Sequence, residues 1–181
     1  MLAAILAGGR SSRMGRDKAS LCLGNQTLLE FMESKIRQSG LDRIIICRND
    51  PGCLRDLIPG LGPIGAIYTL RQHYAGSGVL IVPVDMPLLT SHTLCELWRA
   101  GTGKQSAVHA RQSYLPLYLQ LDEPTCETLD RIVKEDHSNK SLGFFLSAIG
   151  AQQLVLEDAD REFANVNTPK DWEDIQKLLP A

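Results

Sequence analysis

Short apolar runs alternate with helical patterns along the whole chain of 181 residues, and this alternation limits the folds that the chain can adopt. Leu2–Leu6, Arg43–Cys47 and Val79–Val84 are mostly apolar, strand-like runs, and each is followed by a stretch with apolar residues at helical spacing. Strands that alternate with helices are typical of a parallel sheet with helices on its faces. The pattern therefore predicts an α/β fold with a mostly parallel sheet. Because no repeat or linker interrupts it, we expect a single domain over residues 1–181.

The other elements follow from apolar spacing and turn residues. The final helix is well marked, because Thr168, Pro169 and Asp171 form a capping box with proline at the first helical position. The Gly-Thr-Gly segment at 101–103 predicts a loop that ends the helix before it. We further expect helices near 27–39, from 63 onward, near 123–134 and near 142–149, and strands near 106–110, 114–119 and 153–156.

Charge and cysteine content argue against several classes of protein. The formal net charge is −2, whereas a nucleic-acid-binding protein usually carries a net basic face. The five cysteines lie far apart without a CxxC pair, which indicates free thiols in a reducing cytosol. No stretch approaches the roughly 18–20 apolar residues that cross a bilayer. We therefore expect a cytoplasmic protein that binds neither nucleic acid nor membrane.

The segment from Leu6 to Lys18, LAGGRSSRMGRDK, is the strongest functional signal. It leaves the end of the first strand, where open α/β sheets bind their ligands. Its glycines let backbone N–H groups approach a ligand closely, and its four cations against one aspartate favour a local polyphosphate site. It matches neither a Walker A loop nor a G-x-G-x-x-G dinucleotide-binding loop. The alternative is a basic surface turn.

Asp85 follows the valine-rich strand and precedes Met-Pro. Because the carboxyl ends of neighbouring parallel strands meet at one edge of a sheet, we expect Asp85 to lie beside the glycine-rich segment. Mg²⁺ binds to one or two carboxylates together with substrate phosphate oxygens, so a single aspartate can anchor it. We therefore predict that Asp85 is a metal ligand. Alternatively, it merely starts a turn before Pro87.

Three more residues could face the same cleft. Asp56 could accept hydrogen bonds from a base or a sugar, or it could be a solvated turn carboxylate. Asn165 and Asn167 come just before the capped final helix, where asparagine is also favoured as a turn residue. The histidines show no metal-ligand spacing, and the G-x-S-x-G motif of many serine hydrolases is absent.

Four segments resemble the molybdenum cofactor guanylyltransferases, a family of the nucleotidyltransferase superfamily: LAGGRSSRMGRDKA, GLGPIGAI, VPVDMPL and NVNTPKDW. They occur in the order of that family and span most of the chain. Gly8-Gly9 resembles the guanylyl enzymes, because cytidylyl relatives usually carry Ala-Gly. The resemblance implies a Rossmann-like, three-layer α/β sandwich with a mainly parallel sheet.

The resemblance also implies roles for individual residues. The nucleotide-binding residues would be Leu6, Ala7, Gly8, Gly9, Gly15, Lys18, Asp56 and Asp85. The catalytic residues would be Arg13 and Lys18, near the phosphates, together with Asp85, which would also bind Mg²⁺. The acceptor-binding residues would be Asn165, Asn167 and Lys140, the last at a site where many relatives have paired arginines.

We therefore predict an Mg²⁺-dependent nucleotidyltransferase that transfers GMP from GTP to the phosphate of molybdopterin cofactor and releases pyrophosphate. Proteins that deliver or receive the cofactor would be transient partners. Two alternatives stay open: a related transferase that uses CTP, or a sugar-phosphate or phospholactate acceptor, and a GTP-binding regulator without turnover. The chain departs from the family mostly on the acceptor side, and its segment between Cys47 and Asp56 is shorter than usual.

Overall fold

Six strands form one central sheet within residues 1–8, 14–136 and 139–179, which the computed structural model describes. The order across the sheet is β4 (Arg43–Cys47), β1 (Leu2–Leu6), β5 (Gly78–Pro83), β7 (Leu117–Gln120), β6 (Val108–Ala110) and β8 (Gln152–Leu154). β7 runs antiparallel to both of its neighbours, and the other neighbouring strands run parallel. The predicted mainly parallel sheet is confirmed.

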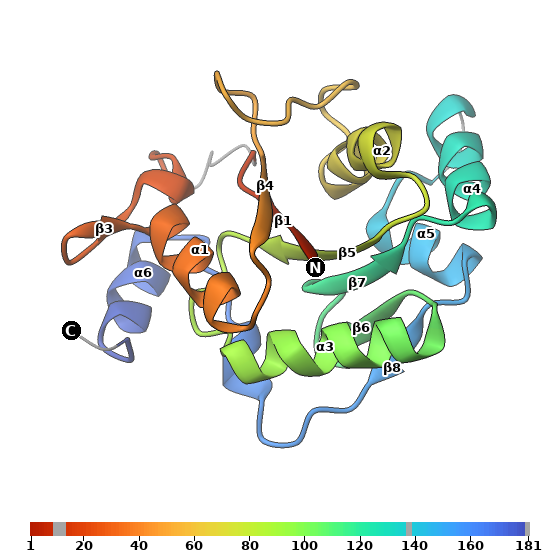
Figure 1. Ribbon diagram of the computed structural model, residues 1–181. Helices are drawn as coiled ribbons and strands as arrows, with labels where there is room; N and C mark the ends of the chain where they lie inside the picture. The colour runs from red at the N-terminus through yellow and green to blue at the C-terminus, as the bar shows by residue number, and fades with distance from the viewer. Residues whose placement is uncertain (9–13, 137–138, 180–181) are drawn as a thin grey trace.

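Helices cover both faces of this sheet, so the fold has three layers (Figure 1). One face packs against α1 (Leu28–Gln38), α3 (Ser91–Lys104) and α6 (Pro169–Gln176). The other face packs against α2 (Pro63–Tyr74), α4 (Glu123–Lys134) and α5 (Leu142–Ala148).

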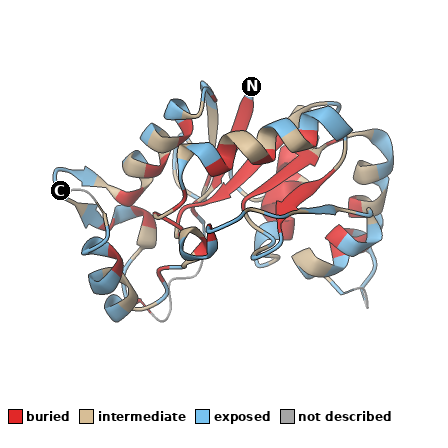
Figure 2. Ribbon diagram, turned by 90° about the horizontal axis from the view of Figure 1, so that it is seen from below, coloured by how far each residue is buried: buried red, intermediate tan, exposed pale blue. Residues whose placement is uncertain are grey.

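Strand β1 shows why one sheet can serve two cores. Ala3 and Ile5 belong to the first core, whereas Leu2 and Ala4 belong to the second. Successive side chains of a strand point to opposite faces, so a continuous apolar run fills both cores. The buried strands accordingly run through the middle of the molecule, between partly exposed helices (Figure 2).

Helix boundaries follow local capping chemistry, which the sequence predicts for α6 and for the start of α2. Thr27 and Thr168 cap α1 and α6, and each accepts a hydrogen bond from the backbone of the third helical residue. Glu30 and Asp171 bond back to the backbone of these caps, which completes two capping boxes. Pro63 is the first residue of α2.

The predicted loop at 101–103 is wrong, because α3 continues to Lys104. Gly101 is buried against β7, where a Cβ atom would lie 2.0 Å from the ring of Tyr118. The glycine therefore permits close packing of helix on strand and does not end the helix. The strands predicted from 106 and 114 begin later, at Val108 and Leu117.

Several short elements lie outside the sequence predictions. They are the 3-10 helices η1 (Lys18–Ser20) and η2 (Asp160–Phe163), and the hairpin of β2 (Cys22–Leu23) and β3 (Gln26–Thr27). All five cysteines are free thiols. In the described part of the chain, no helix combines the length and the apolar character that crossing a membrane requires.

The topology brings the functional segments to one edge of the sheet. Strands β4, β1 and β5 are parallel and in register, so Cys47, Leu6 and Pro83 end side by side. Because β7 is antiparallel to β5 and Leu117 pairs with Ile81, the loop before β7 also reaches this edge. Open α/β sheets bind ligands at this edge.

Candidate active site

A cavity of about 890 Å³ opens at the carboxyl edge of the sheet. Its walls come from the ends of β1, β4 and β5, from η1, from the segment before α2, from the loop before β7 and from the start of α5. This volume lies in the range of small-molecule binding sites. The lining includes Leu6, Ala7, Gly8, Asp17, Lys18, Asn49, Asp56, Asp85, Tyr114, Leu142 and Asn165.

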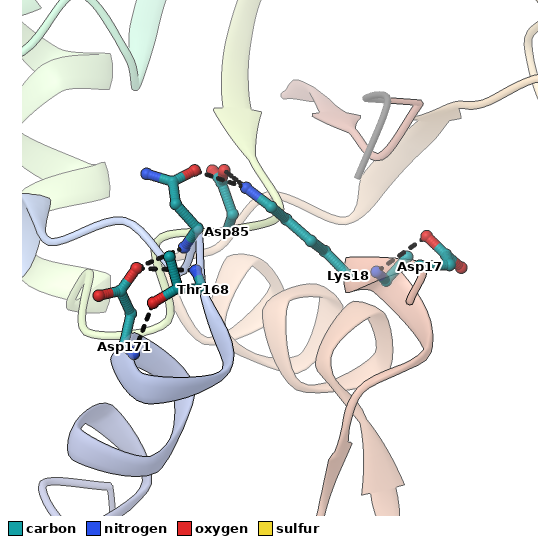
Figure 3. A network of polar contacts seen from close by, with 7 residues as sticks. Asp17, Lys18, Asp85, Thr168 and Asp171 are labelled. Carbon is teal, nitrogen blue, oxygen red and sulfur yellow. Dashed lines mark hydrogen bonds and ion pairs between the residues drawn. The ribbon is translucent and has the colours of Figure 1, made fainter. Parts of the chain in front are cut away.

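Lys18 joins the two strongest motifs of the sequence. Its Nζ donates to Oδ2 of Asp85 at 2.7 Å and to Oδ1 of Asn167 at 2.8 Å (Figure 3). The Lys18 and Asp85 side chains are only 17% and 22% exposed. Both are therefore partly shielded from water, which strengthens a charge-assisted hydrogen bond. The glycine-rich segment, the end of β5 and the segment before α6 thus converge at one point.

The segment before α6 is fixed by its capping box. The carboxylate of Asp171 accepts from the backbone N–H of Asn167 at 3.0 Å and of Thr168 at 2.8 Å (Figure 3). These backbone hydrogen bonds lower the pKa of Asp171 below its usual value of 3.8. Val166 N–H donates to the Asp85 carbonyl at 2.8 Å, which ties this segment to the end of β5. The capping box therefore holds Asn167 beside Lys18.

Asp17, which lines the cavity, forms a second polar link with Arg48. Arg48 donates to Asp17 Oδ2 at 2.7 Å and also pairs with Asp50. Asp17 caps η1 by accepting from Ala19 N–H at 3.2 Å and from Ser20 Oγ at 2.6 Å. Burial raises the pKa of Asp17, but the Ser20 hydrogen bond and the Arg48 charge outweigh it, so the pKa lies below 3.8. The start of η1, and with it Lys18, is attached to the end of β4.

Asp56 lines the cavity from the segment between β4 and α2, which forms neither helix nor strand. Its backbone N–H donates to the Asn49 side chain at 3.0 Å, and the next residue, Leu57, donates to the Thr69 hydroxyl at 3.0 Å. Burial raises the pKa of the Asp56 carboxyl. A partly desolvated carboxyl at a fixed position suits hydrogen bonding to N–H or O–H groups of a ligand.

The described neighbours of Gly8 leave room for a side chain at this position. A Cβ atom there would lie 3.5 Å from the Cys47 carbonyl and 3.6 Å from the Arg48 Cα, which are ordinary contacts. Its lack of a side chain instead leaves the cavity wall at backbone level, where a ligand can reach the main chain.

The site fits Mg²⁺ better than a metal with a dedicated protein cage. Among the residues that the structure describes, no three His, Cys, Asp or Glu side chains gather as a metal site. Asp85 supplies one carboxylate to a cavity that is large enough for phosphates. Mg²⁺ commonly binds to one or two carboxylates, water and substrate phosphates, so this donor set suits it.

The structure places the predicted residues in three groups. Leu6, Ala7, Gly8, Lys18, Asp56, Asp85 and Asn165 line the cavity, and Asn167 contacts Lys18. Gly15, with a φ angle of +63°, and the half-buried Lys140 do not belong to the lining. Gly9 and Arg13 lie outside the described residues. The roles assigned to all these residues stay predictions.

The sequence analysis missed two features of the site. Arg48 follows directly after β4, so its place at a strand end was the available signal. Tyr114 lines the cavity from the loop before β7, and a single aromatic residue in a polar segment gives little warning of that position.

Comparisons with known proteins find relatives over most of the chain. A family model described as MobA-like NTP transferase domain matches residues 3–149. Molybdenum cofactor guanylyltransferase from Xanthomonas euvesicatoria pv. vesicatoria (strain 85-10) is 35% identical over 172 residues, 93% of this chain and 90% of that protein. The protein of the same name from Yersinia pestis (strain Pestoides F) is 27% identical over 190 residues, 93% of each chain. Molybdopterin-guanine dinucleotide biosynthesis protein A from Archaeoglobus fulgidus shares the fold, with a TM-score of 0.81 at 20% identity over 98% of both chains.

Proposed function

The chain belongs to the MobA-like NTP transferase family, and from this premise we propose that it transfers GMP from GTP to the phosphate of molybdopterin cofactor. The names of its relatives support the substrates. The observation that carries the proposal is the 2.7 Å contact between Lys18 and Asp85, which joins a cation and a carboxylate from two motifs in one cavity.

In the proposed reaction, a phosphate oxygen of the acceptor attacks the α-phosphorus of GTP. A new P–O bond forms to the acceptor, the bond from the α-phosphorus to the bridging oxygen breaks, and pyrophosphate leaves. Transfer of this kind depends mainly on positioning and on neutralising charge. Lys18 would donate to the phosphates, and Gly8 would leave room for them against the main chain.

The proposal includes Mg²⁺ dependence, with Asp85 as the protein ligand. Bound there, the ion would neutralise phosphate charge as the leaving group departs. Lys18 and Asn167 would orient the Asp85 carboxylate, since Lys18 bridges both side chains. The proposal also includes a cytosolic location, and the five free thiols support a reducing compartment. Proteins that deliver or receive the cofactor would be transient partners.

Pyrophosphate release tests the proposal. The wild-type protein is assayed with GTP, CTP or UTP, with and without molybdopterin cofactor, and with Mg²⁺ or a chelator. We expect release only with GTP, acceptor and Mg²⁺ together. Lys18→Ala removes one preorganised donor and should lower kcat about 10²–10³-fold while the protein stays folded. Asp85→Ala should abolish the Mg²⁺ response.

Three outcomes would contradict the proposal. Equal turnover with CTP would assign a different nucleotide. Tight GTP binding without pyrophosphate release would indicate a regulator. Near-full activity of Lys18→Ala would show that the chemistry lies elsewhere.

A further inference from the structure

Tyr114 is an exposed aromatic residue in the lining of the cavity. It lines the cavity from the loop before β7, and it is 52% exposed. Most other large aromatic residues in the described part of the chain are more deeply buried. An exposed ring in a concave site can offer one face to a flat ligand.

The Tyr114 ring is held from two sides. His109 is only 4% exposed and meets the ring edge to face, with centroids 5.3 Å apart at 67°. His109 is itself fixed, because its Nδ1 lies 2.7 Å from the Ala110 carbonyl and 3.0 Å from the Ser113 carbonyl. On α5, a Cβ atom added to Gly143 would lie 3.0 Å from the ring, so this glycine lets the ring pack closely. A ring held in this way loses little conformational entropy when a ligand binds.

The sheet order places Asp85 between the Asn49–Asp56 segment on one side and Tyr114 on the other. That segment follows β4 at one edge strand, Asp85 follows β5 in the middle, and Tyr114 lies in the loop before β7. A nucleotide that extends from Asp56 toward Lys18 and Asp85 leaves the β7 side of the cavity open. A second substrate whose phosphate must reach Asp85 would therefore approach from the Tyr114 side.

We propose that the Tyr114 ring stacks on the flat pyrimidinone ring of the acceptor, with Leu115 and Leu142 as the apolar walls beside it. The inference rests on the proposed function and names the part of the acceptor that this chain recognises. The pyrimidinone ring of a pterin is planar and conjugated even where the adjoining ring is reduced, so it can stack on the tyrosine while the phosphate side chain extends toward Asp85.

Substitutions at this position test the inference. Stacking of a heteroaromatic base on an aromatic side chain changes affinity about 5- to 150-fold. Tyr114→Ser should therefore raise the acceptor KM by a factor in this range and leave the GTP KM within about 2-fold. Tyr114→Phe keeps the ring and should stay within about 3-fold of wild type. Gly143→Ala should raise the acceptor KM although the tyrosine is present. Phe144→Ser is the matched control, since Phe144 is 45% exposed but does not line the cavity.

Calorimetry with 6-hydroxymethylpterin, which has no phosphate, separates this inference from the proposed function. The wild type should bind this pterin, and Tyr114→Ser should not, whether or not the assay detects turnover. An inactive wild type would overturn the proposed function alone. The stacking inference would be overturned if Tyr114→Ser bound the pterin as tightly as the wild type and had the same acceptor KM. It would also be overturned if the variant raised the GTP KM instead.

Discussion

Lys35 anchors the loop that carries Asp85, and it does so at a cost in stability. Its Nζ donates to the Pro87 carbonyl at 2.6 Å and lies 4.5 Å from the centre of the Phe31 ring. Burial lowers the pKa of Lys35 from its usual 10.5 to about 8, although the Glu162 charge partly opposes this change. The folded protein therefore disfavours the charged form of this lysine.

The two pKa values set the size and the sign of the effect. Their difference corresponds to at most about 3 kcal/mol, and solvent screening of a partly exposed side chain reduces it to about 1–2 kcal/mol. Between pH 8 and pH 10.5 the unfolded chain keeps the proton on Lys35 and the folded protein loses it. More protons are then bound in the unfolded state, so the free energy of unfolding rises with pH through this window.

The variant Lys35→Met lacks this titration. At pH 7 it avoids the burial of a charge but leaves the Pro87 carbonyl without its donor, which costs about 0.5–1.5 kcal/mol, so the two effects nearly cancel. From pH 7 to pH 10 the wild type should then gain about 1–2 kcal/mol relative to the variant. Other titrating groups are common to both proteins and cancel in the difference.

Urea denaturation at pH 7, 8, 9 and 10 measures this difference. Lys134→Met is the control, because it removes the same charge from a side chain that is 67% exposed. Parallel pH profiles for wild type and Lys35→Met would refute the reasoning. Lys35→Met should also lower kcat several-fold, because the Asp85–Pro87 loop loses its hydrogen bond to α1.

Two further predictions concern packing and positioning. The ion pair between Arg48 and Asp17 is partly exposed, so its coupling energy in urea unfolding should be about 0.2–1 kcal/mol. A double-mutant cycle with Arg48→Met and Asp17→Asn measures it. Strict additivity of the two substitutions would show that the ion pair is not formed. Gly101→Ala should destabilise the protein by about 1–3 kcal/mol in thermal unfolding, since the new Cβ would overlap the Tyr118 ring. Gly103→Ala on the same helix meets no atom within 4 Å and should stabilise by about 0.5–1 kcal/mol, so equal effects of the two alanines would contradict the packing argument.

The parallel half of the fold could be predicted from sequence because its signals are local. Leu2–Leu6 and Arg43–Cys47 have the predicted bounds. Capping boxes and an N-terminal proline are also local features. The loop predicted at 101–103 is wrong because Gly101 packs against Tyr118, which lies 17 positions further along the chain. A rule that ends helices at glycine considers only neighbouring residues and cannot detect this contact.

The two sides of the site also differ in whether their signals are local in the sequence. The proposed nucleotide side begins with one continuous segment, Leu6–Lys18, in which the residues needed for phosphate contacts are neighbours in sequence. The proposed acceptor side combines the loop before β7, the start of α5 and the segment before α6, which lie far apart in sequence and meet at the cavity.

Short segments that meet only in three dimensions can change one at a time without disturbing the sheet. A substitution such as Tyr114→Ser alters an exposed ring, whereas a change at Lys18 breaks contacts with both Asp85 and Asn167. Acceptor preference should therefore be the more readily altered property of this chain. Exchange of the 113–115 loop for that of a related transferase should change acceptor KM values and leave GTP binding within about 2-fold, whereas a large loss of GTP affinity would show that the two sides are not separable.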